Sequence, residues 1–382
     1  MPPPKTLVFH IGDPKTGSSS IQQALFGRTW SSPTQRIAYP DGLTSIPLAK
    51  SLYADAPPDQ REKRFAATAD WLNRQTGDIA VLSAEHFSFI PPTTLKSAIE
   101  QFLPDHAGNI QVIAYVRPHI PRLISTFAQR VKTRGLKKPF ESFCQATAEK
   151  GQFRYTPRFV AWRDTFGAGF TLRPMLRPLL WRQDVVADFL YNVLGSDDFT
   201  TDPTRDQNAS PTLYHLACLL LVQSALRQAD IAQDLRHALC SRLAERLARD
   251  ATPADARLKM PRPLLARMQD AHRDDAAALD EAFFTDFNGF TGTPFSTALE
   301  TAALTATDEP QSIAAKDHFS ASQRQALDRI VTEIIHQLHA DPTSWKRHYR
   351  QAKTNKSGSN QANPASAIRI ETLLGDICAV LS

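Results

Sequence analysis

Short apolar runs separated by longer stretches with helical character fill the first half of the chain. An apolar run of four to eight residues bounded by turn residues is typical of a strand buried on both faces. The stretches between the runs favour helices, several of which open on Ser, Thr or Pro. Strands are expected at 6–11, 78–83, 110–116 and 170–174, and helices from Ser18 onward and at 60–74, 92–102, 118–134 and 184–194.

This alternation predicts an α/β fold, with a parallel sheet between two layers of helices. Beyond residue 195 the pattern becomes almost entirely helical. Helices are expected at 211–250 (one long or broken), 263–284, 320–339 and 368–381. A polar stretch rich in Asn, Ser, Gly and Pro precedes the last of them and resembles a linker. The expected organisation is a core at 1–195, a helical extension at 196–352, a linker at 353–366 and a C-terminal helix at 367–382, which is a candidate for contact with a second copy of the chain.

Composition narrows the class of protein without identifying it. Hydrophobic residues make up 42% of the 382 positions, which is ordinary for a globular protein. The four cysteines form no CxxC pair, so neither a disulfide framework nor a zinc site is expected, and a reducing compartment fits best. The apolar run after residue 5 is too short for a secretory signal, and the longest other run, 216–222, is too short to span a bilayer. We therefore expect a cytoplasmic protein without a transmembrane segment.

The net charge of +5 is unevenly distributed. Six basic and no acidic residues lie between 342 and 370, and a second basic cluster lies at 130–138. Such clusters form either an ordinary solvated surface or a surface that attracts an anionic cofactor or acidic glycan. No known nucleic-acid-binding motif appears, so nucleic acid is not an expected partner.

The strongest chemical signal is the sequence HIGDPKTGSSS at 10–20. It places a glycine-containing loop between a predicted strand and a predicted helix, where backbone N–H groups and the helix dipole together bind anions. Gly12 and Gly17 have the spacing of the nucleoside-triphosphatase loop GxxxxGK[ST], but Ser18 stands where that loop carries lysine. The lysine lies earlier, at Lys15. The third predicted strand ends in Arg117 rather than in a magnesium-binding carboxylate, which favours an anion site that needs no metal.

The loop resembles the PKTGTTxLQ loop of sulfotransferases, with serines in place of threonines, and the preceding His-Ile-Gly is similar to bacterial members of that family. The resemblance implies a P-loop-like α/β core that binds 3′-phosphoadenosine 5′-phosphosulfate (PAPS) and releases 3′-phosphoadenosine 5′-phosphate (PAP). It also implies that Lys15 neutralises the bridging oxygen as the S–O bond breaks, as fixed charges at a reacting centre do in general. The residues expected to hold the 5′-phosphosulfate are Pro14, Lys15, Thr16, Gly17, Ser18, Ser19 and Ser20.

A second motif follows about 100 residues later, at the end of the third predicted strand. Arg117 and Ser125 are similar to the 3′-phosphate motif of the same family, an arginine followed eight residues later by a helix serine. Arginine can bind a phosphate through two N–H donors. Arg122 lies one turn before Ser125 and is a weaker candidate. The close resemblance covers about residues 5–130, and no later 3′-phosphate contact is recognisable.

Sulfuryl transfer to a hydroxyl requires a base, which many family members carry after the second strand. Glu85 is the first choice here and His86 the second. The sequence therefore predicts a PAPS-dependent sulfotransferase acting on a carbohydrate or other small acceptor. The alternatives are a non-catalytic nucleotide-binding protein on the same scaffold and a P-loop kinase-like phosphotransferase. Neither the acceptor nor the oligomeric state is specified by these motifs.

Overall fold

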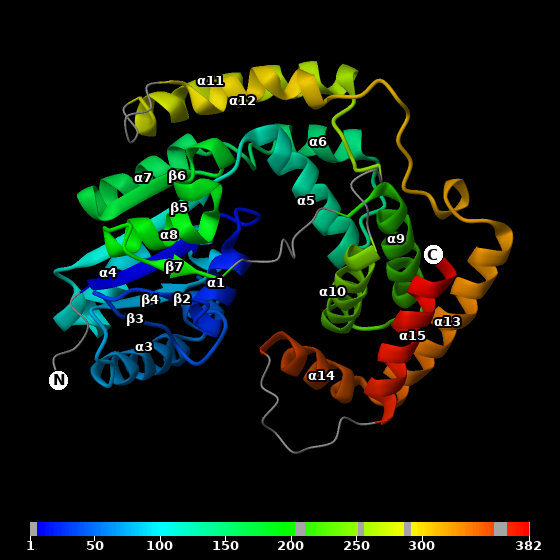
Figure 1. Ribbon diagram of the computed structural model, residues 1–382, viewed down its shortest axis with the longest axis horizontal. Coiled ribbons are helices and arrows are strands. Elements are labelled where there is room, and N and C mark those ends of the chain that lie inside the picture. The colour runs from blue at the N-terminus through cyan, green and yellow to red at the C-terminus, as the bar shows by residue number, and fades with distance from the viewer. Residues whose placement is uncertain (1–5, 203–210, 251–255, 286–291, 355–364, 382) are drawn as a thin grey trace. The chain divides into compact units, whose positions relative to one another are not determined.

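The computed structural model describes residues 6–202, 211–250, 256–285, 292–354 and 365–381. The chain forms two compact units, each assembled from separate stretches of sequence (Figure 1). The first comprises the described residues within 1–122, 151–205 and 269–302, and the second those within 123–150, 206–268 and 303–382. The sequence analysis instead divided the chain at single points, and those domain boundaries stay a prediction.

A five-stranded parallel sheet organises the first unit, in the order β3-β4-β1-β5-β6. The four long strands agree closely with those predicted, while the edge strand was not foreseen. The edge strand, β3, has only two residues, and a strand this short has no measurable periodicity that would distinguish it from a loop. The strands are β1 (Thr6–Gly12), β3 (Ile37–Ala38), β4 (Ile79–Ser83), β5 (Ile110–Val116) and β6 (Phe170–Pro174).

Helices cover both faces of this sheet. On one face, Val8 and Ile113 share an apolar cluster with α1 (Ser18–Gly27) and α8 (Val185–Leu194). On the other face, Phe9 packs against Phe87, with ring centroids 5.4 Å apart. Further helices of the first unit are α2 (Ile46–Lys50), α3 (Pro58–Asn73), α4 (Pro92–Phe102), α7 (Thr156–Phe166) and α12 (Pro294–Thr301). The predicted α/β class with a three-layer parallel-sheet core is confirmed.

Helix α7 covers the same face as Phe9 and was not predicted as a helix. Its residue Phe159 stacks on Phe170 of β6, at 6.4 Å between ring centroids. Two short strands, β2 (Trp30–Ser31) and β7 (Thr200–Thr201), pair antiparallel with each other, and they were also not predicted. Sequence periodicity failed at α7 because its apolar residues are distributed around the helix rather than along one stripe.

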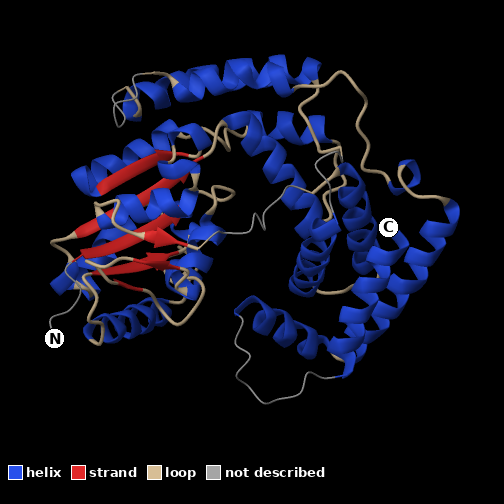
Figure 2. Cartoon of the chain, in the orientation of Figure 1, coloured by secondary structure: helices blue, strands red, loops and turns tan. Residues whose placement is uncertain are grey.

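The second unit consists of helices packed around an apolar core, as Figure 2 shows by their colour. The predicted helix at 211–250 is broken in two, with Asp230 in the left-handed region between the parts. Its elements are α6 (Phe140–Glu149), α9 (Leu213–Gln228), α10 (Gln233–Asp250), α13 (Ala321–Ala340), α14 (Pro342–Thr354) and α15 (Ala365–Leu381). The large helical C-terminal part is confirmed. Most of the predicted linker at 353–366 lies outside the described residues, and helices reach both of its ends.

Two helices run from one unit into the other. Helix α5 (His119–Arg134) belongs to the first unit up to Arg122 and to the second unit after it. Helix α11 (Arg262–Phe283) belongs to the second unit up to Met268 and to the first unit after it. No helix among the described residues is long and apolar enough to cross a membrane.

Candidate functional site

The carboxyl end of β1 lies at the centre of the sheet, with β4 on one side and β5 on the other. The chain moves from one side of β1 to the other between β4 and β5. Ligands of open parallel sheets bind at the carboxyl ends of the strands beside such a switch point. The loop from Gly12 to Gly17 therefore stands where the topology itself favours a ligand site.

This loop turns sharply because three of its residues adopt positive φ angles. Gly12 has φ 74°, Lys15 φ 69° and Gly17 φ 85°. The last of these is the N-cap of α1, and within the described part of the chain no side chain caps that helix. Glycine adopts this conformation readily, but lysine does so at a cost of about 1 kcal/mol or more. Strain at a lysine beside an uncapped helix N-terminus is a feature of functional loops.

Both glycines are also required by close approaches. A Cβ atom on Gly12 would lie 3.0 Å from Cα of Glu85, and one on Gly17 would lie 2.9 Å from a methyl carbon of Val185. The first contact brings the segment after β4 directly against the loop. Glu85, predicted as the base from its place after the second long strand, thus lies beside the loop that carries Lys15.

The hydroxyl groups of the loop differ in their surroundings. Thr16 is fully buried and donates its hydroxyl hydrogen bond to the carbonyl of Asp13, which closes the turn. Ser18 is only 5% exposed, and its Oγ has no hydrogen-bond partner among the described residues. Ser19 is exposed and Ser20 half-buried. A buried hydroxyl without a partner costs free energy, so Ser18 is ready to bind a ligand oxygen.

The second candidate base, His86, lies in the short 3-10 helix Glu85–Phe89. Burial lowers the pKa of His86, and the charge of Lys50 lowers it further. Its Nδ1 is buried without a hydrogen-bond partner in the described structure. The imidazole is therefore neutral near pH 7 and can accept a proton.

Three arginines and one carboxylate gather beside the loop, at the end of β5. Asp13 is 1% exposed, and its two oxygens lie 3.2 Å from Arg122 and 3.1 Å from Arg158. Arg117, the predicted 3′-phosphate ligand, is half-buried at the strand end; burial lowers its pKa, and so does the charge of Arg122. Two guanidinium groups thus share the carboxylate of Asp13, and the charge of Arg117 adds to theirs, which leaves an excess of positive charge at this strand end.

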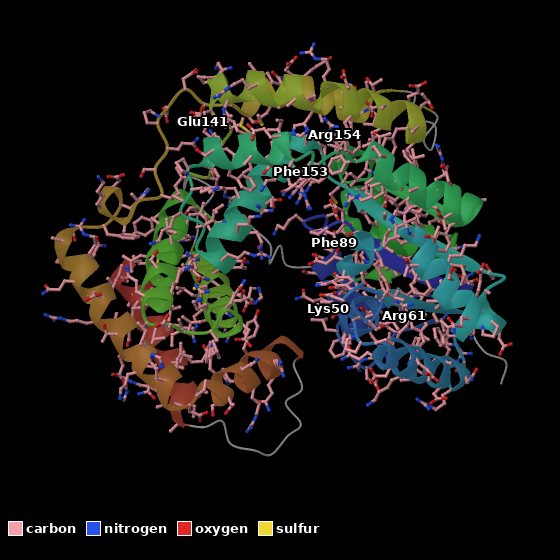
Figure 3. All side chains as sticks on the ribbon, turned by 180° about the vertical axis from the view of Figure 1, so that it is seen from behind. Lys50, Arg61, Phe89, Glu141, Phe153 and Arg154 are labelled. Carbon is pink, nitrogen blue, oxygen red and sulfur yellow. The ribbon has the colours of Figure 1, made fainter. Side chains whose placement is uncertain are left out.

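The arginines also have unused hydrogen-bonding capacity. Arg122 is 5% exposed, yet its Nε and one terminal nitrogen have no partner among the described residues. The same holds for Nε of Arg158. The planes of these guanidinium groups are held by aromatic rings, Arg122 over Phe153 at 5.2 Å and Arg158 over Phe159 at 4.6 Å; Phe153 is marked in Figure 3. Buried donors that are fixed in place and lack an acceptor favour an anionic ligand.

Sequence reasoning found part of this group. Arg117 followed from a motif and Arg122 was a weaker candidate, while Asp13 and Arg158 were missed. Asp13 lies inside the loop motif itself, so its position was a usable signal. Arg158 lies in α7 outside any motif, and only the fold brings it to the loop. Ser125 is buried on α5 in the second unit, so its part in a phosphate site stays a prediction.

A third group of side chains, His10, Ser83 and Gln22, lies on the sheet side of the loop. His10 Nδ1 is 2.8 Å from Ser83 Oγ, and the side-chain amide of Gln22 donates to the same oxygen at 3.1 Å. Burial lowers the pKa of His10 to about 3, so its ring stays neutral. These contacts join β1, β4 and α1 and support the loop from the sheet side. Among the described residues, no cluster of three or more His, Cys, Asp or Glu side chains could hold a metal ion.

Neither known protein-family profiles nor curated protein sequences match the chain. Among solved structures, it is similar to a sulfotransferase from Alicyclobacillus acidocaldarius, with 14% sequence identity and a TM-score of 0.44. The similarity covers 74% of this chain and 96% of the other. A likeness this distant leaves the chemistry of the site to be inferred from its own residues.

Proposed function

We propose that this chain is a sulfotransferase that moves the sulfuryl group of PAPS to a hydroxyl of a small acceptor. The observation that carries the proposal is the pairing of two anion sites at neighbouring strand ends. One is the Lys15 loop at the end of β1, and the other is the arginine group at the end of β5. PAPS carries its anionic groups at the 3′ and 5′ positions, which suits two separate cationic sites.

Each residue has a defined part in this proposal. The N–H groups at the start of α1 and the Ser18 hydroxyl bind the 5′-phosphosulfate, and Arg117 with Arg122 and Arg158 binds the 3′-phosphate. Glu85 removes the proton from the acceptor hydroxyl, with His86 as the second candidate. The acceptor oxygen then forms its bond to sulfur. The bond from sulfur to the phosphate oxygen breaks, and Lys15 stabilises the charge that collects on that oxygen.

The geometry supports this assignment of the base. Glu85 lies directly against Gly12, at the start of the loop, whereas the ring of His86 packs against the aromatic side chains of Tyr53 and Phe89. A base acts only when it lies within hydrogen-bond reach of the reacting hydroxyl. Glu85 is therefore the first candidate for the base.

Two measurements test the proposed function. Isothermal titration calorimetry should detect binding of PAP to the full-length protein without added metal. Mass spectrometry should then detect a sulfated product when PAPS and an acceptor panel are added. Absence of PAP binding would overturn the proposal. Binding of PAP without transfer to any acceptor would favour a nucleotide-binding protein, and magnesium-dependent turnover of ATP would favour a phosphotransferase.

A further inference from the structure

A groove of about 460 Å³ opens on the first unit beside the candidate base. Its volume falls within the range of small-molecule sites, roughly 300–1,000 Å³. One wall follows α2, and the other consists of the last residue of the 3-10 helix Glu85–Phe89 and the two residues after it. The lining residues are Leu52, Tyr53, Ala54, Asp55, Phe89, Ile90 and Pro91.

The lining is mainly apolar and carries an aromatic ring on each wall. Phe89 is 58% exposed, which makes it the one strongly exposed large hydrophobic side chain among the described residues of the first unit. Phe89 and Lys50, which precedes the first wall, are both marked in Figure 3. An exposed phenylalanine beside a candidate active site gains free energy when a ligand covers it.

His86 connects this groove to the transfer site. Its ring stacks on Tyr53 with centroids 6.5 Å apart, and meets Phe89 edge-on at 6.3 Å. Glu85, its neighbour, touches Gly12 of the loop. Tyr53 lies close enough to this carboxylate for its charge to matter: burial raises the pKa of Tyr53, and the charges of Asp55 and Glu85 raise it further. His86 therefore borders the groove through its contacts with Tyr53 and Phe89, and Glu85 lies near enough to Tyr53 for its charge to act there.

We infer that the acceptor is a phenol, a planar aromatic alcohol whose ring lies against Phe89 and Tyr53 with its hydroxyl toward Glu85 and His86. This inference rests on the proposed function and specifies the acceptor, which the sequence left as a carbohydrate or other small molecule. Aromatic rings bind well between other aromatic rings. A sugar ring needs hydrogen-bond partners around its edge, and this lining offers few. The phenolic oxygen bonds to sulfur, its proton passes to Glu85 or His86, and PAP leaves with the former bridging oxygen.

Of the charges near the groove, the positive charge of Lys50 favours a phenol as acceptor. Lys50 lies near enough to His86 to lower the pKa of that imidazole. A cation there also stabilises the negative charge that develops on a phenolic oxygen as its proton leaves. A phenol has a pKa near 10, as the tyrosine side chain does. It therefore loses its proton more easily than an alcohol of a sugar.

The experiment compares 2-naphthol with a glucosamine oligosaccharide as acceptors for the full-length protein and PAPS. We expect 2-naphthol to be sulfated and the oligosaccharide not. Phe89→Ala should raise the KM for 2-naphthol about tenfold, which corresponds to about 1.4 kcal/mol, with kcat changed less than twofold, because the aromatic contact with the acceptor is lost. Phe89→Trp keeps an aromatic wall and should retain the KM of the unmodified protein.

Three results would overturn the phenol inference. They are turnover of the oligosaccharide alone, an unchanged KM for 2-naphthol in Phe89→Ala, and the same rise in KM for Phe89→Trp. Calorimetry with PAP on each variant separates this inference from the proposed function. If PAP binds normally but 2-naphthol is not sulfated, only the acceptor assignment fails. If the unmodified protein does not bind PAP, the sulfotransferase proposal fails together with it.

Discussion

The carboxylate of Asp13 lies 3.1 Å from the guanidinium group of Arg158, which is 145 positions further along the chain. Asp13 also pairs with Arg122, so one loop residue orients two cations from different helices. A carboxylate in an anion-binding loop would repel its ligand if it were unpaired. Here Asp13 is paired with Arg122 and Arg158 and holds both side chains in place, and under the proposed function these arginines bind the 3′-phosphate.

Removal of one arginine from this group tests its role. Arg158→Gln should weaken PAP binding about tenfold to a hundredfold, because a hydrogen bond to a charged group contributes roughly 1.5–3 kcal/mol. Binding of adenosine 5′-monophosphate, which lacks the 3′-phosphate, should change little. Calorimetry measures both. Arg64→Gln, at an exposed position of α3, is the matched control and should bind PAP normally. Equal losses for the two nucleotides would contradict a 3′-phosphate role.

Because Lys15 has a positive φ angle, a single substitution at this position should change the stability and the activity of the protein in opposite directions. Lys15→Gly should raise the free energy of unfolding by about 1 kcal/mol, because glycine adopts φ 69° without strain. The same change should lower kcat by a factor of about 100 or more, because no cation then meets the leaving oxygen. Urea denaturation and a turnover assay provide the two readings. Lys63→Ala, at an exposed lysine of α3, should alter neither. A Lys15→Gly protein with full activity would refute the proposed role of this lysine.

The choice between the two candidate bases can be made from variants and pH. Glu85→Gln should lower kcat by a factor of about 100 to 10,000, as loss of a general base does. His86→Gln should have a smaller effect. Burial and Lys50 lower the pKa of His86, so its ring gains a proton only below pH 6.5, and any loss of activity due to His86 appears on the acidic side. If His86→Gln abolishes turnover while Glu85→Gln stays active, the base is His86.

A buried histidine pair should make the first unit sensitive to acid. His272 stacks on His119 with centroids 4.7 Å apart, and His119 Nε2 lies 2.9 Å from Asp275. Burial lowers the pKa of His272 to about 4, with the charge of His119 as the next cause. Between pH 6.5 and pH 4 the unfolded chain therefore binds a proton that the folded chain does not. The free energy of unfolding should fall as the pH falls through this range, by up to roughly 3 kcal/mol.

Urea denaturation at pH 7 and pH 5 measures that dependence. His272→Phe should reduce the difference between the two pH values, because phenylalanine cannot take up the proton. His339→Gln, at an exposed histidine of α13, should leave the difference unchanged. A pH dependence that survives in His272→Phe would assign it to other groups, such as His10, whose pKa is also lowered by burial.

The sequence predicted the parts of the fold whose signals are local. The strands at 110–116 and 170–174 and the helix at 92–102 were placed to the residue, because apolar runs and proline starts mark them directly. The loop around Lys15 was also found from a local signal, its two glycines. The structure requires glycine at both positions because of their backbone angles and close contacts. Helix α7 and the edge strand β3 lacked such marks.

What the sequence could not supply depends on distant pairs. Arg158 became part of the candidate site only because α7 packs on the sheet, and no pattern near residue 158 indicates this. The groove near Phe89 is likewise formed by two segments that follow different helices. Pairing of Tyr115 with Arg173 across β5 and β6, and of both with Asp188 of α8, also requires the folded sheet.

The passage of α5 and α11 between the two units has a consequence for biosynthesis. Residues 269–302 belong to the first unit, although its last strand, β7, ends at Thr201. A nascent chain therefore cannot complete the first unit when its last strand emerges from the ribosome. It must wait until residues 269–302 emerge, and by then residues 123–150 and 206–268 of the second unit have already been translated. Truncation after residue 205 should for this reason yield a sheet that lacks His272, the buried partner of His119, and is prone to aggregate.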